Sequence, residues 1–329
     1  MVSSLDQDSL TSAEFATDAP RIVFMGTPDF AVPSLNALAA VGLKPIAVAT
    51  GSDKKRGRGQ KVSSTPVKLA ADALGIDTIL QPESVKDPSF AQNVRQLNPD
   101  IIVVVAFRIL PPEVFEAARL GTFNLHGSLL PRYRGAAPIN HAIMQGDTET
   151  GVTTFFLKQL VDTGNVILKR RLSIGPNETA GDVHDRMMIL GADAVVETVQ
   201  RIIRGDLTTT PQDDTQATPA PKIFRKDCEL DFSGSASEVH NQIRGLSPWP
   251  GAFTFLNGKQ LKVFSSEVHD SSSTTADPGR LTKEDGALLV SCGTGCLRLT
   301  EVQIEGKRRV TATDFLNGVL IEDGQMVGR

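Results

Sequence analysis

The chain has 329 residues, of which 40% are hydrophobic and 22% are charged, a composition typical of globular proteins. Its longest apolar runs, such as Ile101–Phe107, are much shorter than the roughly 20 residues that a membrane-spanning helix needs, so we expect no membrane segment. Proteins that coat nucleic acid non-specifically are usually strongly basic, and the net charge of −4 excludes that class while leaving room for local basic patches.

The cysteines and the first residues of the chain favour a cytoplasmic protein. Cys228, Cys292 and Cys296 are too few for a disulfide framework, and the C-x3-C spacing of the last two has no second ligand pair nearby. We therefore predict reduced thiols and no zinc site. Residues 1–20 are polar and acidic and contain no Lys or Arg, unlike a secretory signal or a transit peptide. We expect them to form a disordered extension.

From Arg21 to Gly205, short apolar segments typical of strands alternate with segments of helical spacing. The predicted strands cover 21–25, 45–50, 101–106, 122–125, 153–157 and 166–172, and the predicted helices cover 31–41, 67–74, 112–119 and 180–203. The β-branched run at 101–106 is typical of a strand covered on both faces in a parallel sheet, whereas the last two strands are expected to pair antiparallel. The alternation predicts a doubly wound α/β domain over 21–205.

The pattern changes after Gly205. Residues 206–221 are rich in Thr, Pro, Asp and Gln without periodicity, which is typical of a linker. Over 222–329 apolar residues recur with a period of two, as in 261–264 and 297–304, which predicts a small β-barrel or sandwich. The expected turns are Asn257-Gly258, Asp285-Gly286 and Glu305-Gly306, with a Ser- and Thr-rich mobile loop at 269–278 and a helical turn at 314–317.

Asn124 and His126 lie two residues apart at the end of a predicted strand, so their side chains project to the same face. They stand at the carboxyl edge of the predicted sheet, where open α/β domains place their ligands. Gly127 and Ser128 allow a sharp exit from the strand, and Pro131 stiffens the loop. From Asn124 and His126 alone, a pair of hydrogen-bonded turn residues and a ligand site are equally good explanations.

A longer string around this pair resembles the signature of a known family. The string runs Asn124-Leu-His-Gly-Ser-Leu-Leu-Pro-Arg-Tyr-Arg-Gly-Ala-Ala-Pro138 and is followed by Asp162-Thr-Gly164. It resembles the signature of the methionyl-tRNA formyltransferases. The broader folate-dependent formyltransferase family shares the Asn-x-His, Ser-Leu-Leu-Pro and Asp elements. The narrower family is indicated by 21–30, 57–61 and 247–250, and the resemblance runs from Arg21 to the C-terminus. One departure is Lys158, where many members carry an acidic residue.

The resemblance implies an N-terminal doubly wound, Rossmann-like formyltransferase domain (21–205), a linker (206–221) and a small C-terminal OB-like β-barrel domain that binds tRNA (222–329). It implies a cytoplasmic, monomeric enzyme that moves a formyl group from its co-substrate 10-formyltetrahydrofolate to the free amino group of initiator methionyl-tRNA. The product, N-formylmethionyl-tRNA, would serve translation initiation, and no metal is required.

The chemistry of such a transfer fits the residue types that the chain supplies. Attack of an amine on a formyl carbon gives a tetrahedral oxyanion, to which the side-chain amide of Asn124 can donate a hydrogen bond. His126 is the expected proton carrier and a second electrostatic stabiliser. Asp162 can hold His126 or an ordered water in the correct protonation state. These three residues are therefore the predicted catalytic group.

The resemblance also assigns residues to the two substrates. Ser128, Leu129, Leu130 and Pro131 would line the folate site, with 104–110 beside the pterin unless that stretch is only a core strand. The basic segment Lys54–Lys61 matches a loop that the family inserts into the tRNA acceptor stem, which makes Arg58 and Lys61 the candidate tRNA contacts. Without the resemblance, such a charge run would be read as a solvated loop.

Weaker features include two further basic patches and the only tryptophan. For 169–171 and 307–309, an RNA contact and a solvated face are equally good explanations. Ser247–Gly251 carries Trp249, which we expect to pack structurally between the domains.

Three other functions compete with the favoured one. A formyltransferase acting on an amino-sugar nucleotide would not need the basic loop or the long C-terminal domain. A formyltetrahydrofolate hydrolase would use the same three catalytic residues but not the loop around Arg58. A non-catalytic RNA-binding module with a decayed enzyme domain is disfavoured, because Asn124, His126 and Asp162 are all present.

Overall fold

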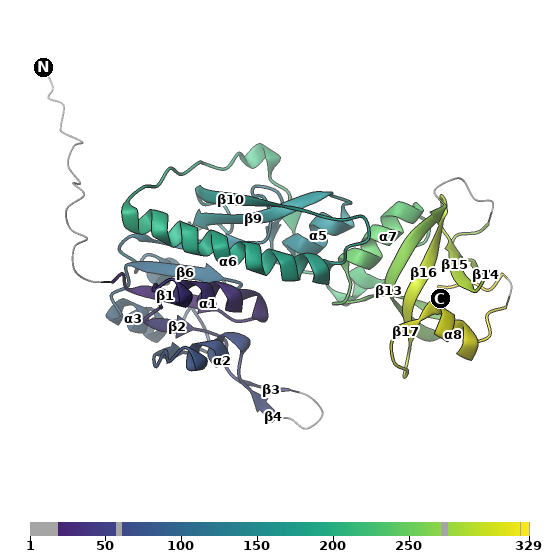
Figure 1. Cartoon of the computed structure of the whole chain (residues 1–329), viewed down its shortest axis with the longest axis horizontal. Coiled ribbons are helices and arrows are strands. Elements are labelled where there is room, and N and C mark those ends of the chain that lie inside the picture. Colours follow the sequence, from purple (N-terminus) through teal and green to yellow (C-terminus); the bar gives the residue numbers. More distant parts are fainter. Residues whose placement is uncertain (1–18, 57–60, 271–275, 323, 329) are drawn as a thin grey trace, which may run out of the picture. The chain divides into compact units, whose positions relative to one another are not determined.

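The computed structural model describes residues 19–56, 61–270, 276–322 and 324–328 (Figure 1). Most of the predicted N-terminal extension and residues 271–275 of the predicted loop lie outside these ranges. The chain divides into two compact units, one from the residues up to Asn124 with Val195–Thr210, the other from Leu125–Ala194 with the residues from Pro211 onward. None of the helices in the described ranges is long and apolar enough to span a membrane.

The first unit is built on parallel strands in the order β6-β1-β2-β5. These are β6 Ile101–Val105, β1 Ile22–Gly26, β2 Ala47–Ala49 and β5 Ile79–Leu80. All residues of β1 and β6 are buried, as their unbroken apolar sequences predict for strands covered on both faces. The strands predicted at 21–25, 45–50 and 101–106 are confirmed, and β5 is an addition.

Short helices follow these strands. They are a 3-10 helix at Asp29–Ala31, α1 Val32–Ala40, α2 Pro66–Ala73, α3 Pro88–Gln96 and α4 Pro112–Phe115. Helix α3 was not predicted, although Asp87-Pro88 is a strong start signal: the Asp87 side chain accepts from the Ser89 amide, and Pro88 occupies the first helical turn, where no amide partner is needed. Its polar composition concealed the three buried residues that form its inner face, Phe90, Ala91 and Val94.

A two-stranded hairpin belongs to the same unit. Strands β3 (Lys54–Arg56) and β4 (Lys61–Ser63) pair antiparallel, and Figure 1 shows them extending away from α2 and the parallel strands. Lys54–Arg56 and Lys61 of the predicted basic segment thus lie on this hairpin. Arg58 lies outside the described residues, and so does the side chain of Lys61.

Strand β7 (Gly121–His126) lies between β6 and β9 in the strand order β10-β9-β7-β6-β1-β2-β5. Strands β9 (Glu149–Phe156) and β10 (Val166–Ser173) pair antiparallel, which confirms the prediction for the last two strands of this sheet. Helix α6 (Ala180–Arg204) confirms the long predicted helix. The second unit also contains α5 (Pro138–Met144) and the short parallel pair β8 (Arg134–Gly135) and β11 (Pro219–Ala220).

The C-terminal part forms an antiparallel sheet in the order β12-β13-β16-β15-β14, with β17 paired to β16, as predicted for a β domain. The strands are β12 Ala252–Leu256, β13 Lys259–Asp270, β14 Leu281–Glu284, β15 Ala287–Ser291, β16 Cys296–Ile304 and β17 Val310–Thr311. Both residues of the Asn257-Gly258 and Asp285-Gly286 turns have positive φ, the geometry that suits tight two-residue hairpins. These turns are confirmed.

Two helices accompany this sheet, together with a 3-10 helix at Arg225–Cys228. Helix α7 (Ala236–Gly245), which was not predicted, starts with a reciprocal capping box between Ser235 and Glu238. It contributes Val239 and Ile243 to the apolar core of the domain and also packs against α5. Helix α8 (Ala312–Gly318) extends the predicted turn at 314–317, and Figure 1 shows it beside β16 and β17.

Candidate active site

His126 is the last residue of β7 and is buried, with 6% of its surface exposed. Its Nε2 lies 2.8 Å from the carbonyl oxygen of Tyr133. A carbonyl oxygen can only accept, so Nε2 carries a hydrogen and donates it. This contact fixes the tautomer of the neutral ring and leaves the lone pair on Nδ1.

Asp162 lies opposite that lone pair. Its Oδ2 is 3.9 Å from His126 Nδ1, too far for a hydrogen bond but close enough for an ion pair when the ring is protonated. The same Oδ2 accepts a hydrogen bond of 3.0 Å from the Gly135 amide. Asp162 is 8% exposed and has a φ of 56°, a conformation that Asp tolerates better than most residues. The two atoms are too close for a third heavy atom to lie between them, so a substrate group or a water that contacts both must approach from one side.

The loop after β7 is held to β9 by hydroxyl groups. Thr153 Oγ1 donates to the Ser128 carbonyl at 2.7 Å and accepts from the Leu130 amide at 3.1 Å. Ser128 Oγ donates to the Arg132 carbonyl at 2.6 Å. Ser128 and Leu130 are completely buried, whereas Leu129 and Pro131 are half-buried. Ser128 and Leu130 thus hold the loop in its conformation. The contact of residues 128–131 with folate stays a prediction.

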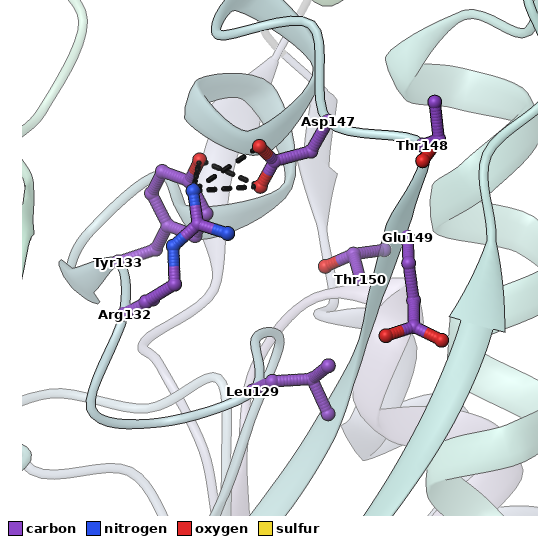
Figure 2. Close-up of a pocket in the computed structure, with 7 residues that line it drawn as sticks. All are labelled: Leu129, Arg132, Tyr133, Asp147, Thr148, Glu149 and Thr150. Carbon is purple, nitrogen blue, oxygen red and sulfur yellow. Dashed lines mark hydrogen bonds and ion pairs between the residues drawn. The ribbon is translucent and has the colours of Figure 1, made fainter. Parts of the chain in front are cut away.

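Tyr133 links this loop to a cavity with several polar lining residues (Figure 2). Its hydroxyl donates to Asp147 Oδ2 at 2.7 Å, and the Arg132 guanidinium contacts both partners. Burial, together with the adjacent Asp147 carboxylate, raises the pKa of the Tyr133 hydroxyl, so it stays protonated and donates. The cavity has a volume of about 180 Å³ and is lined by Leu129, Arg132, Tyr133, Asp147, Thr148, Glu149 and Thr150. Neither His126 nor Asp162 lines it.

The segment predicted as a linker is attached to the loop after β7. Thr218 accepts from the Tyr133 amide through Oγ1 (2.9 Å) and from the Arg134 amide through its carbonyl (2.8 Å). Strand β11 then pairs with β8, where a Cβ on Gly135 would lie only 2.5 Å from the Ala220 carbonyl oxygen. No local sequence pattern predicts this attachment, because Tyr133 and Thr218 are 85 residues apart.

The other predicted site residues are placed as follows. Asn124 is half-buried in β7, two residues before His126 and on the same face by strand periodicity. The 104–110 stretch combines a buried end of β6 with a loop in which Leu110 is buried and Ile109 is 70% exposed. Lys158, the departure from the family pattern, donates to Asn165 Oδ1 at 2.9 Å across the loop that carries Asp162.

The expectation for Trp249 is wrong, because its side chain is 78% exposed. Its neighbours make the structural contacts instead. The Ser247 carbonyl accepts from the Gly181 amide at 3.0 Å, and the Pro248 ring lies where a Cβ on Gly181 would be. These two residues occupy the space at the start of α6 and leave the indole outside.

A metal site was not expected. In the described part of the chain, no three side chains of His, Cys, Asp or Glu come together as a metal ion would need.

Comparison with known proteins gives one consistent family. A formyl transferase family model matches residues 20–199, and a model of the formyl transferase C-terminal domain matches residues 222–320. The chain is 50% identical over 303 residues to the methionyl-tRNA formyltransferase of Chlorobium luteolum, covering 91% of this chain and 96% of that protein. It is 45% identical over 308 residues to that of Geobacter metallireducens, covering 93% and 98%.

Solved structures share the fold at lower identity. The N-formyltransferase from Helicobacter canadensis, solved with folinic acid and dTDP-3-aminofucose, is 21% identical, with a TM-score of 0.66 over 85% of this chain and 98% of that one. HypX from Aquifex aeolicus, solved with tetrahydrofolic acid, is 18% identical, with a TM-score of 0.61 over 91% of this chain and 47% of that one.

Proposed function

Because the chain belongs to the formyl transferase family, we propose that it transfers a formyl group from 10-formyltetrahydrofolate to the amino group of methionyl-tRNA. The observation that carries this proposal is the buried pair of His126 and Asp162, in which a ring nitrogen with a free lone pair faces a carboxylate. The relatives that match this chain over more than nine-tenths of its length support the choice of acceptor.

The amine needs positioning more than activation. A free α-amino group titrates near about 7.7–8, and esterification of the neighbouring carboxyl lowers that value, so part of the amine is neutral at cellular pH. Holding it against the formyl carbon turns a bimolecular step into an effectively unimolecular one. The catalytic group then has two tasks, which are to stabilise the oxyanion and to move protons.

His126 can transfer a proton through Nδ1 while its Nε2 keeps the hydrogen bond to the Tyr133 carbonyl. Nε2 stays bonded to the Tyr133 carbonyl while Nδ1 takes the proton that the attacking amine releases. The resulting imidazolium is stabilised by the Asp162 carboxylate across the gap, and Nδ1–H can return the proton to the leaving nitrogen of the folate. Asn124, on the same face of β7, would donate its amide hydrogens to the oxyanion.

The remaining assignments belong to the proposal. Residues 21–205 would form the catalytic domain and 222–329 the tRNA-binding domain, with Arg58 and Lys61 contacting the acceptor stem and 128–131 the folate. The enzyme would act as a monomer in the cytoplasm, without a metal, and would prefer initiator tRNA.

The main alternative is formylation of an amino-sugar nucleotide. Solved structures of sugar formyltransferases share the fold, but at about 20% identity they bear on the fold alone. The relatives named for methionyl-tRNA are more than twice as similar in sequence, and the alternative is not favoured.

The direct test is transfer of a labelled formyl group from 10-formyltetrahydrofolate to charged initiator tRNA. Elongator methionyl-tRNA and an amino-sugar nucleotide serve as parallel acceptors, and release of free formate reports hydrolysis. We expect transfer to initiator methionyl-tRNA to exceed the other reactions. Equal transfer to both tRNAs would remove the initiator preference, and absence of transfer to either would remove the proposed function.

A further inference from the structure

Gln212, which is not one of the proposed catalytic residues, makes hydrogen bonds to the backbone on either side of Thr163. Its Nε2 donates to the carbonyl oxygens of Asp162 at 2.9 Å and of Gly164 at 2.8 Å. Both hydrogens of its amide are thereby used on the backbone carbonyls of the two residues that flank Thr163. Gln212 comes from the segment predicted as a linker and lies 50 residues from Asp162 in sequence.

Arg134 fixes the orientation of that amide. Its Nε and one terminal nitrogen donate to Gln212 Oε1 at 3.1 and 2.8 Å, and the same nitrogen forms an ion pair with Asp214 at 2.7 Å. Since the guanidinium can only donate, Gln212 must present its oxygen to Arg134 and its NH₂ group to the loop. The next residue, Gly135, donates its amide to the Asp162 carboxylate. Asp162 is therefore held at its backbone by Gln212 and at its side chain by Gly135.

The loop around Asp162 has little apolar burial of its own. Leu160 is 71% exposed and Val161 is 48% exposed, so hydrophobic packing does not fix the approach to Asp162. The residue itself has a left-handed backbone. Beyond it, Gly164 packs so closely on β9 that a Cβ there would lie 1.5 Å from the Phe156 carbonyl oxygen. Polar contacts to the backbone must hold this segment in place.

We propose that Gln212 is a positioning residue that holds Asp162 opposite His126 Nδ1. This inference rests on the proposed function for its kinetic readout. A misplacement of about 1 Å in an active site can cost about 100-fold in rate. Loss of the Gln212 amide is therefore expected to lower kcat by roughly 10- to 100-fold, with KM for folate and tRNA changed about twofold or less.

Two substitutions separate the amide donors from the rest of the side chain. Gln212→Ala removes both donors and the contact to Arg134. Gln212→Glu keeps the side-chain length and an oxygen for Arg134 but has no hydrogens for the two carbonyls. If the donors matter, Gln212→Glu fails to restore the rate. The matched control is Gln216→Ala, because Gln216 lies in the same segment and donates only to Asp213, at 2.8 Å.

A double substitution tests whether Gln212 acts through Asp162. In the Asp162→Ala background, Gln212→Ala should have no further effect on kcat, because residues that act as a unit are not additive. A general structural role would instead lower the rate by the same factor in both backgrounds.

Hydrogen exchange of 157–165 supplies a readout that needs no activity. In Gln212→Ala and Gln212→Glu, we expect this peptide to exchange faster than in the wild type and in Gln216→Ala, with the rest of the chain unchanged. If the wild type transfers no formyl group to any acceptor, the proposed function fails while exchange still decides the positioning role. Wild-type exchange in both Gln212 variants, restoration of the rate by Gln212→Glu, or additivity with Asp162→Ala would overturn the inference.

Discussion

Two buried histidines of this protein have the same support on one side of the ring and different partners on the other. His126 and His240 are 6% and 5% exposed, and each points Nε2 at a backbone carbonyl, of Tyr133 at 2.8 Å and of Pro176 at 3.0 Å. Nδ1 of His240 is 3.0 Å from the Ser266 hydroxyl, whereas Nδ1 of His126 faces Asp162 across 3.9 Å.

From that difference we infer a structural role for His240 and propose the catalytic role for His126. The Ser266 hydroxyl can donate to Nδ1, so the neutral form of His240 has both nitrogens satisfied and gains nothing from a proton. Burial lowers the pKa of His240, and the charge of Arg244 lowers it further, against the opposing effects of the Pro176 carbonyl and Glu267. His126 instead has an unbonded lone pair beside a carboxylate, an arrangement that allows a proton to arrive and leave.

The largest expected effect comes from the same substitution at both rings. Glutamine can donate to a backbone carbonyl as each histidine does, but it cannot carry a proton. We expect His126→Gln to lower kcat by about 10²–10⁴-fold and His240→Gln to leave the rate per folded molecule within about twofold. Steady-state formyl transfer at matched folded concentration measures this. Similar losses of rate in the two variants would show that the two rings do not differ in role.

Asn124 lies on the same face of β7 as His126 and is the proposed donor to the oxyanion. Asn124→Ala removes one donor to the developing oxyanion, and we expect kcat to fall by about 10²–10³-fold. Single-turnover rates with both substrates bound measure the chemical step. As a control, His240→Gln should show the wild-type single-turnover rate. If Asn124→Ala shows the wild-type single-turnover rate but binds its substrates more weakly, Asn124 serves substrate binding instead.

His240 is expected to matter for stability. His240→Ala leaves the Ser266 hydroxyl and the Pro176 carbonyl without their partner, and each such loss costs about 1–3 kcal/mol. We therefore expect the free energy of unfolding to fall by on the order of 3 kcal/mol, measured by urea titration. Equal stability of His240→Ala and wild type would show that water replaces both contacts without cost.

The smallest expected effect is on the pH dependence of that stability. The unfolded ring takes up a proton near pH 6.5, while the folded ring has a lowered pKa and resists it. The contribution of His240 is complete above about pH 6.5 and is lost as the pH falls through the folded pKa, by at most about 1.4 kcal/mol per unit. Urea titrations of wild type and His240→Gln between pH 7.5 and 5.5 measure the difference. Parallel curves for the two proteins would contradict this expectation.

Local patterns in the sequence predicted the regular parts of the fold. The strands β1, β6 and β7 and the long helix α6 follow from unbroken apolar runs and helical spacing, and the hairpin turns follow from Asn-Gly and Asp-Gly pairs. Helices α3, α5 and α7 were not predicted, because polar residues such as Gln92, Asn140 and His240 interrupt their apolar spacing. Their first turns nevertheless carry proline or a capping box.

The residues of the candidate site were proposed from the sequence alone, whereas the groups that hold them in place were not. Asn124, His126 and Asp162 stand in a string that resembles a family signature. The groups that orient them are a backbone carbonyl, a backbone amide and a glutamine from a segment with no periodicity. Contacts made by backbone groups do not depend on residue type, so no sequence pattern predicts them. Gln212 and Asp162 are 50 residues apart, so no local pattern predicts their contact either.

In the proposed mechanism, His126 Nδ1 transfers the proton beside the Asp162 carboxylate. Asp162→Asn tests it most directly, because the amide keeps the size of the side chain and can still accept from the Gly135 amide while removing the charge. Formyl transfer from 10-formyltetrahydrofolate to methionyl-tRNA should fall by about 10²–10⁴-fold in this variant with the unfolding free energy little changed. A folded Asp162→Asn enzyme that transfers the formyl group at the wild-type rate would contradict the account.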